Sequence, residues 1–190
     1  MASVISAIFP LSFSDTLFRD MQYAANIHRN KAYGNGKLYT YHLECVLEVA
    51  SRYKKYCIDN IEYLARCEIA ILHDTIEDCE QSRTKTYREI KDMCGLRVAE
   101  GTFCVTDELG RTRKEEKERT YPKIKSNPDA IYVKLADRIA NYEESIKTNN
   151  IRMLKVYKEE MADLHNGIET DDFHDMWKHL DTISNYKSNL

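Results

Sequence analysis

The sequence is poor in the residues that interrupt regular structure. Its 190 residues include only three prolines and six glycines, and these two residue types are the strongest local interrupters of helices. No segment alternates apolar and polar residues as a half-buried strand does. The sequence therefore predicts an all-α fold, as a single helical domain over residues 1–190 with its core at about 14–168.

The chain also lacks a long apolar run and any CxxC pair. No stretch approaches the roughly 18 uncharged apolar residues that a membrane helix needs. The mildly apolar start, residues 1–13, has no basic segment and contains Pro10, unlike a secretory signal. The six cysteines are scattered, and we expect reduced thiols. These absences predict a soluble, cytoplasmic protein with no membrane partner.

Neither sign of charge is in large excess. The chain has 28 basic and 31 acidic residues, for a formal net charge of −3 at pH 7. A protein that binds nucleic acid along its surface needs a basic face. We therefore expect no nucleic-acid partner, and we expect anions to be bound in a local pocket.

Apolar residues recur at helical spacing in most of the chain. Ser14 or Asp15 is the expected N-cap of a helix that runs to about residue 28. Further helices are predicted at about 39–50, 59–72, 84–95, 98–105, 127–142, 151–165 and 171–179. Residues 107–119 have no clear apolar face. We expect a solvated loop there, with a phosphate-contacting lid as the alternative.

The densest group of chemically active side chains is the run HDTIED at 73–78, which follows an apolar segment. In a helix, His73 and Glu77 share one face and Asp74 and Asp78 share the next. Three carboxylates and one imidazole this close together repel unless something positive lies among them, so a divalent cation is expected. For this hexapeptide alone, the alternative is a solvated acidic helix end.

A further acid lies in an apolar stretch. Asp137 follows the Ile, Val and Leu residues of the helix predicted at 127–142, and a carboxylate buried there without a partner costs several kcal/mol. A salt bridge to Lys134 or Arg138 is one solution, but it leaves the charges at 73–78 unexplained.

Four separated motifs bear on this question. They are His28, Tyr39 and His42; HDTIED at 73–78; Val105-Thr106; and Lys134-Leu135-Ala136-Asp137-Arg138 with Asn141. In order and spacing, over roughly residues 20–160, they resemble the hydrolase domain of the RelA/SpoT homologues. The closest resemblance is to the stand-alone small alarmone hydrolases of the metazoan SpoT-like type. Four motifs in register make a specific match.

The resemblance implies an HD-type helical bundle around a mononuclear metal site. Carried over residue by residue, the family's ligands fall on His42, His73, Asp74 and Asp137. The metal implied is Mn²⁺, one per chain. Other divalent metals remain possible, because a mixed nitrogen and oxygen site does not select one metal by affinity.

The catalytic pair of the family falls on Glu77 and Asp78. These acids would orient a water molecule whose pKa the metal lowers, and would move its proton. For Glu77 alone, a surface acid is the alternative. The implied enzyme is a Mn²⁺-dependent phosphohydrolase that removes the 3′-pyrophosphate of (p)ppGpp. The alternatives are another small nucleotide ester (an adenine alarmone, a nucleoside monophosphate or the 2′-phosphate of NADPH) or a non-catalytic nucleotide sensor.

The substrate contacts are less sharply defined by the sequence. The candidates are Tyr33, Lys31, Lys37, Lys114, Asn141 and Tyr157. The resemblance places Asn141 beside the nucleotide sugar and Tyr157 at the nucleotide pocket, although both could simply pack in the core. The three lysines would act as point charges for phosphates, and His28 is expected to support the site. Tyr33 stands where the family commonly has an arginine that stacks on guanine. A tyrosine can stack but supplies no cation, so the base specificity stays open.

Overall fold

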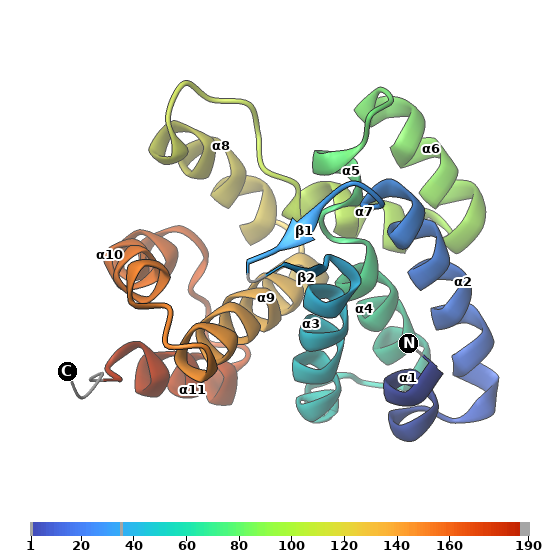
Figure 1. The fold of residues 1–190 in the computed structure, drawn as a ribbon, viewed down its shortest axis with the longest axis horizontal. Coiled ribbons are helices and arrows are strands. Elements are labelled where there is room, and N and C mark those ends of the chain that lie inside the picture. The colour runs from blue at the N-terminus through green and yellow to red at the C-terminus, as the bar shows by residue number, and fades with distance from the viewer. Residues whose placement is uncertain (1, 35, 187–190) are drawn as a thin grey trace.

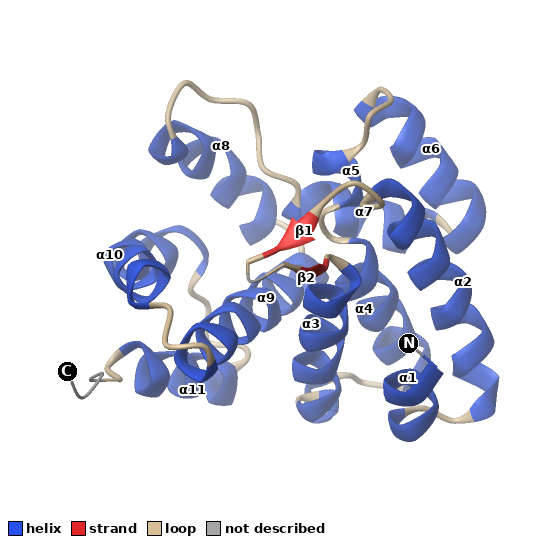
Figure 2. Cartoon of the chain, in the orientation of Figure 1, coloured by secondary structure: helices blue, strands red, loops and turns tan. Residues whose placement is uncertain are grey.

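The scarcity of prolines and glycines shows directly in the length of the helices. The computed structural model describes residues 2–34 and 36–186, and within them nearly all regular structure is helical (Figures 1 and 2). The helices are α1 (Ala2–Ile8), α2 (Leu11–Ile27), α3 (Thr40–Arg52), α4 (Asn60–Leu72), α5 (Thr75–Asp78), α6 (Arg83–Cys94), α7 (Leu96–Val105), α8 (Arg113–Lys125), α9 (Pro128–Lys147), α10 (Ile151–Ile168) and α11 (His174–Ser184), with a 3₁₀ turn at Lys54–Tyr56. The all-α prediction is confirmed.

Helix α9 lies at the centre of the bundle. It packs against α3, α4, α7, α8, α10 and α11, and most of its residues are buried around the whole helix. Its start is well defined, because Pro128 occupies the first turn and the Asn127 side chain accepts hydrogen bonds from the backbone of Asp129 and Ala130. A helix enclosed on every side places its polar residues in the interior. Asp137, in the middle of α9, is therefore 8% exposed.

A short hairpin interrupts the helical pattern. Strands β1 (Ala32–Tyr33) and β2 (Lys37–Leu38) pair antiparallel. Gly34 and Gly36 adopt positive φ angles of 35° and 83° in the connection, which glycine does at little cost. The sequence did not predict these strands, because two residues are too few to show an alternating pattern. The hairpin carries side chains toward α9, as the bonds described below show.

The start of the second helix was predicted wrongly. Helix α2 begins at Leu11, with Pro10 at the N-cap position, and not after Ser14 or Asp15. The Ser14 hydroxyl donates to the Pro10 carbonyl at 3.2 Å, so it bonds back along the helix and caps nothing. The preceding helix, α1, was not predicted either.

The expectation of a solvated loop at 107–119 is wrong for its second half. Helix α8 begins at Arg113, where the Thr112 side chain accepts from the backbone N–H of Glu115. Few apolar residues mark this helix, because ion pairs hold part of it: buried Lys117 pairs with Asp107.

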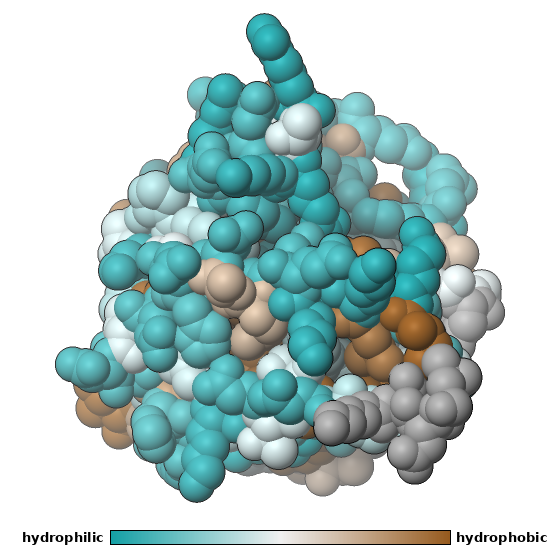
Figure 3. Space-filling view, turned by 90° about the vertical axis from the view of Figure 1, so that its left-hand side faces the viewer, coloured by the Kyte–Doolittle hydropathy of each residue, from teal (hydrophilic) through white to brown (hydrophobic). Residues whose placement is uncertain are grey.

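The face that carries α10 and α11 is mostly hydrophilic (Figure 3). No helix among the described residues is long and apolar enough to span a membrane. Of the domain predicted over residues 1–190, residues 1, 35 and 187–190 lie outside the described part.

Helices α10 and α11 are joined through a histidine. The two ring nitrogens of His165 each lie 2.9 Å from a carboxylate oxygen, one of Glu169 and one of Asp181. The imidazole also lies 4.5 Å, centroid to centroid, from the indole of Trp177. Desolvation lowers the pKa of His165, but the two carboxylates more than offset this and raise it above 6.5.

This junction predicts a pH-dependent stability. Because the pKa of His165 is raised in the folded protein, its contribution is complete below pH 6.5 and is lost as the pH rises through the folded-state value. The free energy of unfolding of the wild type should exceed that of His165→Gln most below pH 6.5, and the difference should shrink at higher pH. Emission of Trp177, the single tryptophan, should rise over the same range as the imidazolium loses its proton. A difference between the two proteins that stays constant with pH would contradict this.

Candidate metal centre and its surroundings

Three separate parts of the chain bring the predicted ligands together. His42 lies in the first turn of α3, His73 ends α4, Asp74 precedes α5, and Asp137 lies in the middle of α9. These helices pack on one another through apolar faces, which fixes the relative positions of the four side chains. His42, His73 and Asp137 are nearly enclosed, whereas 23% of the Asp74 side chain is exposed.

The donor atoms lie at the separations that ligands of one cation adopt. His42 Nε2 lies 3.3 Å from His73 Nε2 and 3.4 Å from Asp137 Oδ1. Asp74 Oδ2 lies 3.0 Å from His73 Nε2 and 3.8 Å from His42 Nε2. With metal–ligand bonds of about 2.1 Å, neighbouring ligands are about 3.0–3.5 Å apart. The residues present therefore fit a divalent cation.

Surrounding hydrogen bonds orient this set. His73 Nδ1 lies 2.9 Å from the Ala70 carbonyl, so in the neutral ring Nδ1 carries the proton and the Nε2 lone pair faces the other donors. The Tyr39 hydroxyl donates to Asp74. The Asn141 amide donates to Asp137 at 2.5 Å, and Lys134 Nζ lies 3.5 Å from the same carboxylate. Asp137 thus has the salt-bridge partner considered above, Lys134, and it also faces the two histidines of the metal centre.

The charges favour ionised carboxylates. Desolvation opposes ionisation of Asp74 and Asp137, but positive neighbours hold the pKa of each below its usual range: for Asp74 chiefly His73, for Asp137 chiefly Lys134. Desolvation likewise lowers the pKa of His73, yet Asp74 and Asp137 outweigh it and raise that pKa to about 9. The raised pKa favours a proton on His73 beside these two carboxylates. Metal binding must displace that proton.

The HDTIED segment is not one continuous helix. The backbone is helical at His73 (φ −54°, ψ −35°) and departs at Asp74 (φ −96°, ψ −3°), and α5 starts at Thr75. The Thr75 hydroxyl, which donates to the Leu72 carbonyl at 2.6 Å, fastens the junction. Adjacent residues of an unbroken helix point in different directions. Because the helix is interrupted here, the side chains of His73 and Asp74 can both reach the centre.

The two acids after the ligands have different surroundings. Glu77 is exposed, and Oε2 accepts a hydrogen bond from the backbone N–H of Asp107 at 3.1 Å. Desolvation, with help from the carboxylates of Asp74 and Asp107, raises the pKa of Glu77. Asp78 pairs with Lys31 and lies 3.3 Å from His28 Nδ1. Desolvation opposes its ionisation, but these two partners lower its pKa.

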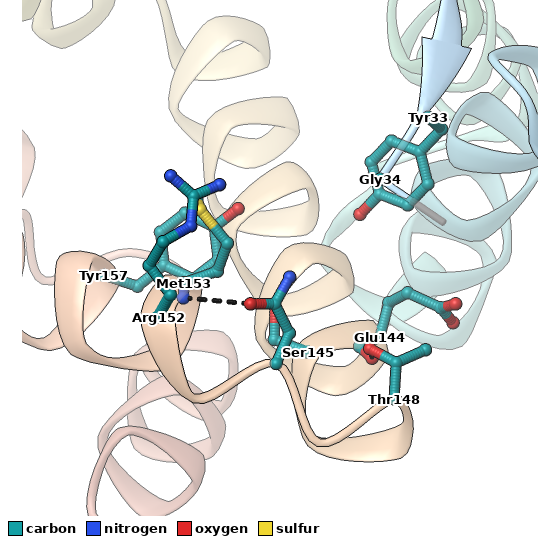
Figure 4. Close-up of a pocket in the computed structure, with 9 residues that line it drawn as sticks. Tyr33, Gly34, Glu144, Ser145, Thr148, Arg152, Met153 and Tyr157 are labelled. Carbon is teal, nitrogen blue, oxygen red and sulfur yellow. Dashed lines mark hydrogen bonds between the residues drawn. The ribbon is translucent and has the colours of Figure 1, made fainter. Parts of the chain in front are cut away.

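The candidate substrate residues gather beside the centre, with one exception. The ring of Tyr33 stacks on that of His42, with centroids 4.9 Å apart, and its hydroxyl donates to Asn141 at 3.1 Å. A cavity of about 410 Å³ opens next to it (Figure 4); its lining is Tyr33, Gly34, Glu144, Ser145, Thr148, Asn150, Arg152, Met153 and Tyr157. Lys37 lies near this cavity, bonded to Glu144 at 3.1 Å. Lys114 is not part of it: its exposed side chain lines a separate cavity between α8 and α10.

The sequence analysis did not find several residues of this region. Lys134 and Tyr39 belong to the motifs quoted above. The sequence therefore marked their positions, but we did not predict that they contact the metal ligands. Arg152, Ser145 and Thr148 carried none, because the face that α9 and α10 turn toward the cavity is known only once the helices are packed. Arg152 and Tyr33 come from opposite sides of the cavity (Figure 4).

Comparison with known proteins agrees with this geometry. No family model matches the chain. The guanosine-3′,5′-bis(diphosphate) 3′-pyrophosphohydrolase of Aquifex aeolicus (strain VF5) is 30% identical over 152 residues, which are 77% of this chain and 19% of that protein. The chain thus spans about a fifth of the length of that curated relative. A solved structure described as a metazoan ortholog of SpoT that hydrolyses ppGpp superposes with a TM-score of 0.65 at 20% identity, over 92% of this chain and 95% of the other.

These findings bear first on the fold and then on the resemblance. The structural similarity shows that the chain has the helical fold of that SpoT ortholog. The sequence similarity to a guanosine-3′,5′-bis(diphosphate) 3′-pyrophosphohydrolase then confirms the resemblance to the RelA/SpoT homologues that the four motifs indicated.

The centre predicts a metal-dependent stability. A divalent cation at about 100 times its dissociation constant should stabilise the fold by about 2.7 kcal/mol, which for a chain of this size raises the melting temperature by about 5–10 °C. Asp137→Ala should abolish that shift, because it removes one ligand of the buried set. The exposed acid Asp172 serves as the control: Asp172→Ala should keep the full shift in a thermal melt with and without Mn²⁺. An undiminished shift in Asp137→Ala would place the cation elsewhere.

Proposed function

We propose that the chain is a Mn²⁺-dependent hydrolase that releases pyrophosphate from the 3′ position of guanosine tetra- or pentaphosphate. The observation that carries the proposal is the convergence of His42, His73 and Asp137, with Asp74 beside His73, next to a cavity of about 410 Å³. The curated relative, named as a pyrophosphohydrolase of this nucleotide, supports the substrate.

The reaction requires an attacking water and a stabilised leaving group. A divalent cation bound at the centre would lower the pKa of a water molecule and polarise a phosphoryl oxygen. The water attacks the phosphorus attached to the ribose 3′ oxygen. The bond from that phosphorus to the 3′ oxygen breaks, and a proton ends on the 3′ oxygen. The products are GDP or GTP and pyrophosphate.

Glu77 and Asp78 are the proposed catalytic pair, with different tasks. Glu77 has a raised pKa, and among the described residues its carboxylate accepts a single hydrogen bond, from the backbone N–H of Asp107. It can therefore orient the water and accept its proton. Asp78 is tied to His28 and Lys31. It would keep the ammonium group of Lys31 beside the departing phosphates, where a point charge stabilises them.

The nucleoside would occupy the cavity that adjoins Tyr33. Asn141 bonds both Asp137 and Tyr33, and so can fix the sugar next to the metal ligands. Tyr33 and Tyr157 offer aromatic surface for the base. Arg152 lines the same cavity and supplies a cation that the tyrosine at position 33 cannot.

The catalytic assignment predicts a split between turnover and metal binding. Glu77→Gln should lower kcat by about 10²–10⁴-fold, the usual contribution of a general base, while metal content stays at one per chain. Asp74→Ala should lose both. Glu80→Gln is a matched control, because Glu80 is an exposed acid three residues away that contacts only Arg29 and Asn30 among the described residues. Full activity in Glu77→Gln would refute its role.

Tyr33 predicts a separable effect on substrate binding. Base stacking on an aromatic side chain is worth about 1–3 kcal/mol, so Tyr33→Ala should raise KM about 5- to 150-fold. Tyr33→Phe keeps the ring and should restore most of the binding. Equal KM values for the two variants would show that the base does not contact this ring.

A second candidate substrate keeps the same centre. Tyr33 stands where the family commonly has an arginine, and this favours testing an adenine alarmone, a nucleoside monophosphate and the 2′-phosphate of NADPH beside the guanosine nucleotide. The ranking of kcat/KM over this panel decides between them. Binding of a nucleotide without turnover, at full metal occupancy, would instead identify a sensor.

A further inference from the structure

A second group of metal-ligating side chains lies on the other side of α4 from α9, among the helices at the right of Figure 1. It consists of Asp20 from α2, Glu68 from α4 and Cys94 from the end of α6, and one donor atom from each lies within 4.8 Å of the others. We propose that these residues form a second cation site, for a thiophilic divalent metal of the Zn²⁺ type. The proposal is independent of the function proposed above.

The spacing and the burial both suit a metal. Cys94 Sγ lies 3.4 Å from Asp20 Oδ1, and adjacent sulfur and oxygen ligands on a tetrahedral Zn²⁺ are about 3.5 Å apart. The Asp20 side chain is completely buried, and the Glu68 side chain is 9% exposed. Asp20 Oδ2 has no hydrogen-bond partner among the described residues. A buried carboxylate oxygen without a partner is costly, and a cation at this position would satisfy it.

A positive group already lies where the cation would bind. Arg19 Nη2 is 2.7 Å from Asp20 Oδ1, 3.3 Å from Glu68 Oε1 and 3.4 Å from Cys94 Sγ. It is therefore within reach of all three donors at once. The Arg19 side chain is 43% exposed, so it can turn outward to solvent without crossing the core.

One guanidinium does not fully compensate the two carboxylates. Desolvation raises the pKa of Asp20 above its ordinary value, although Arg19 opposes this shift. Desolvation, together with the charge of Asp20, raises the pKa of Glu68 to about 7. These shifts show that the surroundings favour additional positive charge. A divalent cation supplies it, and it deprotonates the coordinating thiol.

The donor set distinguishes this site from the histidine centre. A thiolate selects soft or borderline metals, whereas Mg²⁺, Ca²⁺ and Mn²⁺ prefer oxygen ligands. The histidine centre contains no thiol. A cation here would connect α2, α4 and α6, and would stabilise the position of α4, which ends at Leu72, directly before His73.

The test uses Cd²⁺, which replaces Zn²⁺ and gives an ultraviolet charge-transfer band when bound to a thiolate. The folded wild type should show this band at one Cd²⁺ per chain, and Zn²⁺ should displace it. Cys94→Ala should abolish the band, whereas Cys45→Ala, which removes a half-buried thiol on α3, should retain it. Arg19→Gln should bind at least about tenfold more tightly, because the competing cation is gone.

Asp137→Ala separates this proposal from the proposed function. It removes a ligand of the histidine centre and should leave the Cd²⁺ band unchanged. A band that survives Cys94→Ala, or no band in the wild type, overturns the proposal. A band seen in Arg19→Gln but not in the wild type also overturns it, because Arg19 then occupies the position permanently.

Discussion

The structure depends on how two imidazoles, a buried carboxylate and a partly buried one are accommodated where α3, α4 and α9 meet. Removing Asp74 and Asp137 from water costs several kcal/mol each unless positive charge and hydrogen bonds compensate. Tyr39 and Asn141 supply hydrogen bonds to these carboxylates, and Lys134 supplies positive charge. A proton on His73 supplies more, as its pKa of about 9 indicates. A divalent cation would complete it, since the donors of His42, His73 and Asp137 lie close together and Asp74 lies 3.0 Å from His73.

The same elements connect the metal centre with the cavity. Helix α9 carries Asp137, then Asn141 one turn later, then residues that line the cavity. The hairpin adds Tyr33, which touches both His42 and Asn141. A ligand in the cavity would therefore contact residues that in turn hold the metal ligands. This arrangement explains how a change of base contact at Tyr33 can alter specificity while the centre is kept.

Much of this could be predicted from the sequence, and the failures have physical causes. Helical spacing and the scarcity of proline and glycine predicted the all-α class. Widely separated motifs predicted that His42, His73, Asp74 and Asp137 converge, and the structure brings them together. The start of α2, the hairpin and α8 were missed, because a serine bonded backward, a turn set by glycines and buried ion pairs leave no apolar pattern. The cavity wall that contains Arg152 depends on packing between α9 and α10, which no local signal reveals.

The central claim is that one divalent cation lies among these four side chains. Anomalous diffraction from crystals grown with Mn²⁺, recorded near the manganese absorption edge, locates such an ion directly. The account predicts a single strong peak within about 2.3 Å of His42 Nε2, His73 Nε2 and one oxygen each of Asp74 and Asp137. A map with no peak between these residues, at a Mn²⁺ concentration that saturates binding in solution, would contradict it.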